Sequence, residues 1–462
     1  MLDSKPYNLS KVWKRALTSS LSFFIFGYSI GIFTSSQFCI ASALQWGSNS
    51  ELLIAINSSL IPFGAVLGSI IAGFLSHNHG KRHNLIRIDI LIILATLLTC
   101  YPNTISFLIG RFISGVAVGS ISMLASGYTS EFTPKEVAAK MGSLSQLFIM
   151  SGITASNCVC LALPIENCSE DMKYYIFLIF LPPGLCALVQ LLILLKVFKK
   201  ESPFWLIKQK EYKLALASLE SIYNNEYAKE ELEKHLEKEK DNEGSVIQEN
   251  LEPSYKELLT CKSGTTKAMR LGTLIHVFQQ LSGINAIVFY TSLIFLSFGK
   301  GEMFARILTA FSSGSRALAM VFFIPFIDKV SKKSVLVYGT ALMGVCLLVL
   351  GLTDKTGIIP LFIFFIFFYF ALFANSIGPI TWIYSSLVMS DKGLAFAIAT
   401  NWTVAGFLVL GFPFLINGIG LAYSFLIFAF LNIVGAIYFA LDMVDSTGLS
   451  KQELRKLLSE MR

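Results

Sequence analysis

The sequence predicts an all-α membrane protein with twelve transmembrane helices in two pseudo-symmetric six-helix bundles. Three observations lead to this fold class. Only 15% of the 462 residues are charged, against ~25% in a typical soluble protein, and the mean hydropathy is +0.64. Apolar runs long enough to cross ~30 Å of hydrocarbon as helices recur along the chain. A long charged segment divides these runs into two groups of six.

Twelve apolar runs account for the predicted helices. The first is too long for the apolar region of a signal peptide and has no small-residue cleavage site, so we expect it to be retained as a helix. The runs span residues 17–40, 51–76, 84–103, 105–130, 141–164, 173–197, 268–297, 303–328, 334–353, 358–388, 393–416 and 418–442.

The charged segment divides the chain into two related halves. Residues 17–197 and 268–442 are the expected bundles, residues 198–267 a cytosolic, partly helical linker, and residues 1–16 and 443–462 cytosolic tails. Acids and bases alternate in the linker, so no basic patch for nucleic acid forms. A short basic loop follows the second run of each half, HNHGKRH and DKVSKK. Such matched halves are typical of transporters that bind substrate between them near the membrane midplane.

Lysine and arginine are distributed unevenly between the two sides of the predicted membrane protein. With the N-terminus in the cytosol, 31 of the 37 basic residues lie in inner segments and four in outer positions, Arg306 among them. Arg111 and Arg316 fall inside apolar runs. Because cytosolic loops carry the excess of basic residues, both termini are expected in the cytosol.

The seventh run contains the densest set of polar side chains, VFQQLSGINAIVFYTS, with Gln279, Gln280, Ser282 and Asn285. On an ideal helix Gln280 and Asn285 lie ~140° apart, but a break at Gly283 would let both point at one ligand. Uncharged amides suit a neutral ligand with polar groups, since they donate and accept hydrogen bonds without the cost of desolvating a charge. Amides also join transmembrane helices to each other, and the residues alone leave both interpretations open.

The remaining polar residues indicate no catalytic or metal site. The eight cysteines lie mostly in apolar runs without metal-like spacing and are interpreted as small apolar filler. Asn167 begins an Asn-Cys-Ser acceptor for glycosylation in an outer loop. No Ser/His/Asp set, metal cluster or phosphate loop converges, so neither an enzyme nor a cofactor is expected.

Several motifs in both halves match one known family. They are Gly27-Tyr28-Ser29-Ile30-Gly31, Gly110-Arg111 with Gly115 and Gly119, Tyr128-Thr129-Ser130-Glu131 with Pro134, Glu201-Ser202-Pro203 with Trp205-Leu206, Gln279 to Tyr290, Gly378-Pro379-Ile380 with Trp382, Asn401-Trp402, and Asp445-Ser446-Thr447-Gly448. Through them the chain resembles the sugar porter family of the major facilitator superfamily over nearly its whole length. The segment from Gln279 to Tyr290 is the most specific of these matches.

The resemblance implies the major facilitator fold and transport of a sugar between two rocking bundles. Ile149 and Ile153, one and two turns after Gln146, are expected to form an apolar wall of the site. Trp382 is equally consistent with a packing or gate role. The positions that match the family's sugar site are Gln146, Gln279, Gln280, Asn285, Trp382 and Asn401.

The resemblance also implies residues that govern conformational change. Phe289 and Tyr290 stand at the family's outer gate, although tyrosine is also common at membrane interfaces. Arg111, Glu131 and the basic inner loops are expected to form a charge network that holds the outward-open state. Twenty residues of helix span ~30 Å, so Arg111 and Glu131 need not pair directly.

Ser29 departs from the family pattern, because proton-coupled members carry an aspartate there. Coupling requires a titratable carboxylate in the transport path. Asp89 lies near the inner end of the third run, and no acid lies in the middle of a run. We therefore expect a facilitator, while another coupling group would make the chain a proton symporter.

Arg316 is a second departure, twelve residues before Asp328, where facilitative glucose transporters carry a sugar-binding asparagine. An arginine at the membrane centre costs ~2.5–3.5 kcal/mol unless it is compensated. Carbonyls of a broken helix would compensate it, and a local gap would shift the alignment. Alternatively, Arg316 donates to sugar hydroxyls or binds an anionic substrate such as a sugar phosphate.

The leading prediction is a facilitative uniporter for a hexose such as glucose, spanning the plasma membrane by alternating access. Its expected partners are the sugar and the lipid bilayer. The alternatives within transport are a proton-coupled sugar symporter and a carrier of an anionic sugar derivative. A non-transporting sugar sensor is disfavoured by tails of only about sixteen and twenty residues, since sensors tend to have long cytosolic tails.

Overall fold

A computed structural model describes most of the chain. The predicted glycosylation site at Asn167 lies outside the described part, as does Asp328. The described residues are 6–134, 137–164, 172–244, 266–323, 330–356, 358–389, 391–447, 449, 453–454 and 457–458.

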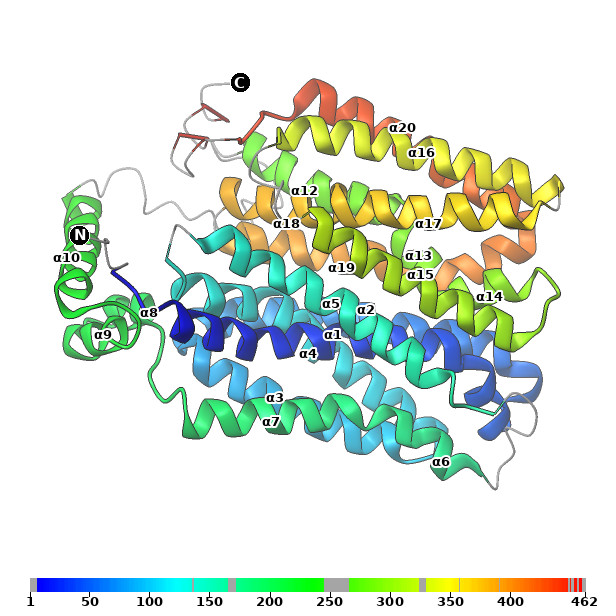
Figure 1. Cartoon of the computed structure of the whole chain (residues 1–462), viewed down its shortest axis with the longest axis horizontal. Helices are drawn as coiled ribbons and strands as arrows, with labels where there is room; N and C mark the ends of the chain where they lie inside the picture. The colour runs from blue at the N-terminus through cyan, green and yellow to red at the C-terminus, as the bar shows by residue number, and fades with distance from the viewer. Residues whose placement is uncertain are drawn as a thin grey trace.

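Long helices lie side by side along one elongated bundle (Figure 1). The first half contributes six crossings, and the sixth consists of two α-helices joined by a short 3₁₀ turn. These helices are α1 (Leu9–Ala43), α2 (Ser50–Asn78), α3 (Lys81–Cys100), α4 (Thr104–Glu131), α5 (Ala138–Cys160), α6 (Lys173–Phe177) and α7 (Pro182–Lys196).

The second half contributes six more crossings, of which the seventh and tenth are interrupted. They are α12 (Thr266–Leu281), α13 (Ile284–Phe289) and α14 (Thr291–Leu296), α15 (Glu302–Phe323), α16 (Lys332–Thr356), α17 (Ile359–Asn375) with α18 (Ile377–Val388), α19 (Asp391–Ile419) and α20 (Leu421–Asp442). The twelve predicted crossings are therefore present in the described part of the chain.

The predicted helix boundaries agree with the structure to within a few residues, except that α1 begins eight residues earlier than expected, at Leu9. Asn8 caps this start, because its side chain accepts a 3.1 Å hydrogen bond from the backbone N–H of Lys11. Ten described helical segments are long and apolar enough to span a membrane, and α5 and α15 are not among them. These two more polar helices pack against each other at the boundary between the halves, so protein rather than lipid covers the faces by which they meet.

Three further helices form a small unit at one end of the bundle: α8 (Pro203–Lys208), α9 (Tyr212–Leu219) and α10 (Asn225–Gly244). The N-terminal segment joins this unit, because the N–H of Asn8 donates to the carbonyl of Ile222 at 2.8 Å. The C-terminal end of α20 lies toward the same end (Figure 1). We call it the terminus-bearing end and the other the far end.

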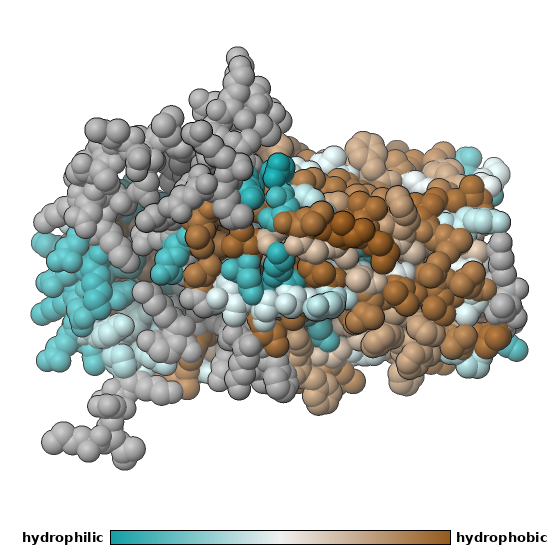
Figure 2. Space-filling model, turned by 90° about the horizontal axis from the view of Figure 1, so that it is seen from above, coloured by the Kyte–Doolittle hydropathy of each residue, from teal (hydrophilic) through white to brown (hydrophobic). Residues whose placement is uncertain are grey.

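On the face seen in Figure 2, the bundle is mostly hydrophobic away from α8–α10 and hydrophilic around those helices. Large apolar side chains point outward, including Phe311, Phe322 and Phe430, which are 67%, 74% and 68% exposed. Such a continuous apolar surface suits hydrocarbon rather than water, and helices satisfy their own backbone polar groups there. The chain is a multi-pass membrane protein.

The interpretation of every cysteine as apolar filler is wrong for Cys39, which is disulfide-bonded. Cys39 lies near the end of α1, close to where the chain leaves the bundle at the far end. The described cysteines that are free are Cys100, Cys158, Cys160, Cys186 and Cys346.

Candidate substrate-binding site

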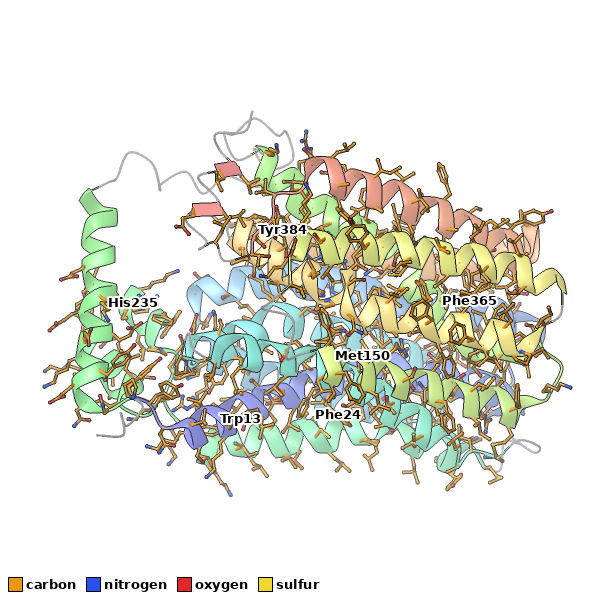
Figure 3. The ribbon with its side chains drawn as sticks, turned by 45° about the horizontal axis from the view of Figure 1, so that its top comes forward. Trp13, Phe24, Met150, His235, Phe365 and Tyr384 are labelled. Atoms are coloured by element: carbon orange, nitrogen blue, oxygen red, sulfur yellow. The ribbon has the colours of Figure 1, made fainter. Side chains whose placement is uncertain are left out.

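A small cavity of about 90 Å³ lies between the two halves. Met150, one of its lining residues, marks its place near the middle of the bundle in Figure 3. All nine residues assigned to the substrate site from the sequence lie on its wall. They are Gln146, Ile149, Ile153, Gln279, Gln280, Asn285, Arg316, Trp382 and Asn401. We call it the central cavity.

Four amide side chains form one continuous chain of hydrogen bonds beside the central cavity. Asn285 Nδ2 donates to Gln280 Oε1 at 2.8 Å, and Gln280 Nε2 donates to Asn401 Oδ1 at 2.9 Å. Asn401 Nδ2 donates to Gln279 Oε1 at 2.8 Å, and Gln279 Nε2 donates to the carbonyl of Gly378 at 3.0 Å. The amides therefore satisfy one another, which makes an uncharged polar cluster tolerable within the membrane.

The break that brings Gln280 and Asn285 together occurs at Gly283, as predicted. Gly283 has a φ of +90° between α12 and α13, a conformation that residues with a Cβ rarely adopt. The interruption leaves the carbonyl of Ser282 without a partner in its own helix. Tyr369 Oη and Asn432 Nδ2 donate to that carbonyl at 3.0 and 3.1 Å, so neighbouring helices repair the break.

Replacing Gly283 by alanine is expected to lower the thermal unfolding midpoint and reduce substrate binding. The left-handed backbone would cost ~1–2 kcal/mol, and the new Cβ would lie 2.8 Å from a ring carbon of Phe428. Gly299→Ala is the matched control, because Gly299 also has a positive φ, of +68°, but no atom within 4 Å of an added Cβ. Equal shifts in the two variants would contradict this account.

Apolar and aromatic side chains form the rest of the central cavity wall. Ile149 and Ile153 lie beside Gln146 on α5, as expected from their helical spacing. Trp382 on α18 packs edge-on against the ring of His276, with centroids 5.1 Å apart. Trp402 packs against Phe26 of the first half, with centroids 5.6 Å apart. Ring faces and branched aliphatic groups complement the C–H surfaces of a sugar.

Arg316 on α15 also reaches the central cavity and is only 3% exposed. Its guanidinium carbon lies 4.6 Å from the centroid of the Phe370 ring. The guanidinium makes no hydrogen bond with any residue in the described part of the chain, and its Nε is buried without a partner. The structure thus provides a cation at this wall of the cavity.

A larger cavity of about 440 Å³ lies at the far end, between α1, α2, α14 and α19. Tyr290 lies on its wall, and its hydroxyl donates to the carbonyl of Val409 at 3.0 Å. Phe289 is buried and lines neither cavity. Tyr290 thus connects the broken seventh crossing with α19 next to this cavity, while the gating role of both residues stays a prediction.

Arg111 and Glu131 lie in separate environments. Arg111 Nη1 donates to the backbone carbonyl of Ser29 on α1 at 2.6 Å, and its guanidinium lies 5.3 Å from the Phe33 ring. Glu131 pairs with Lys81 and accepts a hydrogen bond from Ser202, at the terminus-bearing end. The single network expected from the sequence is therefore wrong for Arg111, because α4 holds the two residues near its opposite ends.

A contact at the terminus-bearing end joins the small unit of α8–α10 to the bundle. Glu201, just before α8, accepts hydrogen bonds from the backbone N–H groups of Arg82 and His83, at 2.8 and 3.2 Å. A carboxylate there is favourable because the start of α3 presents unpaired N–H groups and the positive end of its dipole.

A matching contact holds the tail that follows α20. Ser331 Oγ donates to Asp445 Oδ2 at 2.5 Å, and Thr447 Oγ1 donates to Asp445 Oδ1 at 2.7 Å. Partial burial of the Asp445 carboxyl acts to raise its pKa, but these hydrogen bonds outweigh burial and lower the pKa below its ordinary value. The carboxylate therefore stays charged at neutral pH and fixes the tail to the segment after α15.

The sequence analysis did not assign several wall residues of the central cavity. Some of them, such as Ile30, Gly378 and Trp402, lie inside the family motifs but were given no place in the site. For others the only sequence signal is helical spacing, as for Met150, one turn after Gln146. In an apolar run this spacing marks every buried face equally, so it does not distinguish a cavity wall from ordinary packing. The unassigned wall residues are Phe26, Ile30, Met150, Ile284, Val288, Phe373, Gly378 and Trp402.

Comparisons with known proteins agree with this geometry. The family model described as "Sugar (and other) transporter" matches residues 15–458. The arabinose-proton symporter of Bacillus subtilis (strain 168) is 30% identical, and the alignment covers 98% of this chain and 96% of that protein. The glucose transporter GlcP of Staphylococcus epidermidis (strain ATCC 12228 / FDA PCI 1200) is 28% identical, with 96% of each protein covered.

A solved structure supports the fold independently. The proton:xylose symporter XylE bound to 6-bromo-6-deoxy-D-glucose is similar with a TM-score of 0.84 at 21% identity, covering 98% of this chain and 100% of that one. The family match, the relatives and the twelve-helix fold all identify a transporter rather than an enzyme. The chain therefore belongs to the sugar porter family of the major facilitator superfamily and is a membrane-embedded sugar transporter.

Proposed function

We propose that this sugar transporter is a facilitative uniporter for a hexose such as glucose, and that the central cavity binds the sugar. The observation that carries this proposal is the convergence of Gln279, Gln280, Asn285 and Asn401 on one cavity between the halves. These amides bond to one another beside the cavity. Sugar hydroxyls both donate and accept hydrogen bonds, so they can replace the bonds between these uncharged amides.

Alternating access follows from the position of the central cavity. It lies between the halves, so a rocking motion of one half against the other exposes the bound sugar first to one side and then to the other. The larger cavity next to Tyr290 provides the route from the far end. The contacts of Glu131 and Glu201 hold the terminus-bearing end in the present state.

Uniport is supported by the pair formed by Arg111 and Ser29. Arg111 donates to a backbone carbonyl of Ser29, which has no carboxylate to take up or release a proton. No acidic residue of the described chain lines the central cavity. A proton therefore has no carboxylate there whose charge could couple its movement to that of the sugar.

Proton symport is the second candidate, and one observation favours it. Asp89 on α3 is fully buried, and neither of its carboxylate oxygens has a hydrogen-bond partner in the described part of the chain. Two of the relatives above, the arabinose and xylose carriers, are named as proton symporters. Asp89 does not line the central cavity, however, so a proton on it would be separated from the sugar.

Labelled glucose uptake distinguishes the two candidates. It is measured in cells that lack their own hexose carriers, with and without a protonophore, after surface expression has been verified. We expect saturable uptake that the protonophore leaves unchanged, because a uniporter uses only the sugar gradient. A known proton-coupled sugar symporter in the same cells serves as the positive control and should lose uptake.

The same assay with Asp89→Asn tests the second candidate directly. A uniporter is expected to keep protonophore-insensitive uptake in this variant. Protonophore-sensitive uptake in the unmodified protein that Asp89→Asn abolishes would overturn uniport in favour of symport. We further propose that the protein lies in the plasma membrane. The uneven distribution of basic residues supports an orientation with both termini in the cytosol; an epitope at the N-terminus that antibody reaches in intact cells would contradict that orientation.

A further inference from the structure

Arg316 differs from the other buried arginines in the described part of the chain. Arg15, Arg82, Arg111 and Arg306 each donate at least one side-chain hydrogen bond to an oxygen atom. Arg316 donates none to any described residue. A guanidinium has five N–H donors, and the Nε of Arg316 is buried without a hydrogen-bond partner in the described part of the chain, which is costly. The described residues therefore supply no hydrogen-bond partner for Arg316, and a ligand in the cavity could be that partner.

The carbonyl of Ser282, which the helix break exposes, is not that partner. The carbonyl of Ser282 at the break already accepts from Tyr369 and Asn432, which occupies both of its lone pairs. The Phe370 ring covers one face of the guanidinium. Stacking on a ring face leaves the N–H groups in the plane of the guanidinium available for an oxygen ligand.

The charge of the central cavity points to an anionic ligand. Its described wall contains Arg316, the amides and apolar groups, but no aspartate or glutamate. The wall therefore carries one positive charge without a counter-ion, in surroundings of low polarity where an ion pair is stronger than in water. A substrate with one negative charge would neutralise it.

We infer that the preferred substrate is a monosaccharide carrying one carboxylate, such as a hexuronate. Its carboxylate pairs with Arg316, and its hydroxyls bond to the amide chain through Gln280 and Asn401. The inference rests on the proposed sugar transport through the central cavity and adds the charge of the substrate to it. A carboxylate suits an arginine because it accepts two parallel bonds from one guanidinium.

One arginine fits a carboxylate better than a phosphate. A phosphate monoester carries about −1.5 to −2 charges at neutral pH, whereas the described wall of the cavity offers a single cation. Binding a sugar phosphate there would leave negative charge uncompensated inside the membrane. A sugar carboxylate, with its single negative charge, would leave no charge uncompensated there.

Equilibrium binding to the purified, full-length protein tests the inference. Trp382 and Trp402 line the central cavity, so intrinsic fluorescence reports occupancy. The probes are glucose, glucuronate and glucose 6-phosphate, which share one ring and differ at carbon 6. The variants are Arg316→Gln and Arg316→Lys. Arg270→Gln is the control, because Arg270 is an exposed arginine paired with Asp442 outside the cavity.

We expect glucuronate to bind the unmodified protein about tenfold more tightly than glucose, the scale of one hydrogen-bonded charge pair. Arg316→Gln should remove this preference and change glucose affinity less than about threefold. Arg316→Lys should keep part of the preference, and Arg270→Gln all of it. Thermal unfolding verifies that each variant is folded, and Arg316→Lys keeps the test decisive if Arg316→Gln does not fold.

Three results would overturn the inference. One is equal affinity for glucose and glucuronate, and another is a preference for glucuronate that persists in Arg316→Gln. The third is tighter binding of glucose 6-phosphate than of glucuronate, which would show a dianion site. Glucose binding without preference overturns only this inference, whereas binding of none of the three sugars contradicts the proposed function as well.

Transport in liposomes provides a second readout that a purely structural role of Arg316 would not change. Each turnover with glucuronate moves one negative charge, so an imposed potential, positive inside, should accelerate glucuronate uptake and leave glucose uptake unchanged. In Arg316→Gln we expect the potential-driven glucuronate uptake to fall at least tenfold. Glucuronate uptake that is indifferent to the potential would contradict net charge movement and with it the inference.

Discussion

Replacing Asn401 by alanine is expected to lower sugar transport about 100-fold, equivalent to ~2.8 kcal/mol. Asn401 occupies the centre of the amide chain, because its side chain bonds to Gln279, to Gln280 and to the carbonyl of His276 at 2.8, 2.9 and 3.0 Å. Its removal takes the partner from two buried side-chain atoms, Gln279 Oε1 and Gln280 Nε2, each at a cost of ~1–3 kcal/mol. Both glutamines then lose the orientation in which they meet a sugar.

Thr403→Ala is the matched control on the same helix. The Thr403 hydroxyl donates to the carbonyl of Ala399 in its own helix at 2.8 Å and does not line the central cavity. Initial rates of labelled sugar uptake, normalised to the amount of surface protein, should be nearly unchanged in this control. Equal rates in Asn401→Ala and in the unmodified protein would exclude the amide chain from the transport path.

The largest expected loss of stability follows from replacing Arg306 by methionine. Arg306 is fully buried and donates to the carbonyls of Leu163 and Pro164 after α5, at 2.7 and 3.3 Å, and to Glu302 at 2.5 Å. It thus joins the two halves at the far end. Removing one partner of a buried, hydrogen-bonded charge pair costs ~3–5 kcal/mol, and methionine fills the space without replacing the bonds.

Thermal unfolding of the purified protein measures this effect. The control is Arg270→Gln, which breaks an exposed pair with Asp442 and is expected to cost only ~0.2–1 kcal/mol. We expect a much larger decrease of the unfolding midpoint for Arg306→Met than for Arg270→Gln. Similar midpoints in the two variants would contradict the role of Arg306 as a buried link between α5 and α15.

The fold could be predicted from the sequence because hydrocarbon leaves few choices. A run of about twenty apolar residues must form a helix to satisfy its backbone, so composition and length were sufficient for twelve crossings. The break in the seventh crossing was also predictable. Gly283 lies among amides that a continuous helix would point apart, and the structure has the positive φ there that glycine permits.

Contacts between distant helices could not be predicted, because they depend on depth and rotation that no local pattern specifies. Arg306 was counted with the outer positions, whereas α15 buries it against the carbonyls that follow α5. Arg111 was expected to act with Glu131, but its partner is a carbonyl of α1. In both cases the acceptor is a backbone oxygen, and any residue type provides one.

The most direct test of the account is counterflow in liposomes that contain the purified protein, with equal pH on both sides. Liposomes are loaded with unlabelled glucose and diluted into a trace of labelled glucose. The account predicts a transient accumulation of label that needs no proton gradient and that is lost in Asn401→Ala. Accumulation no greater than in protein-free liposomes, or equal accumulation with Asn401→Ala, would contradict sugar transport through the central cavity.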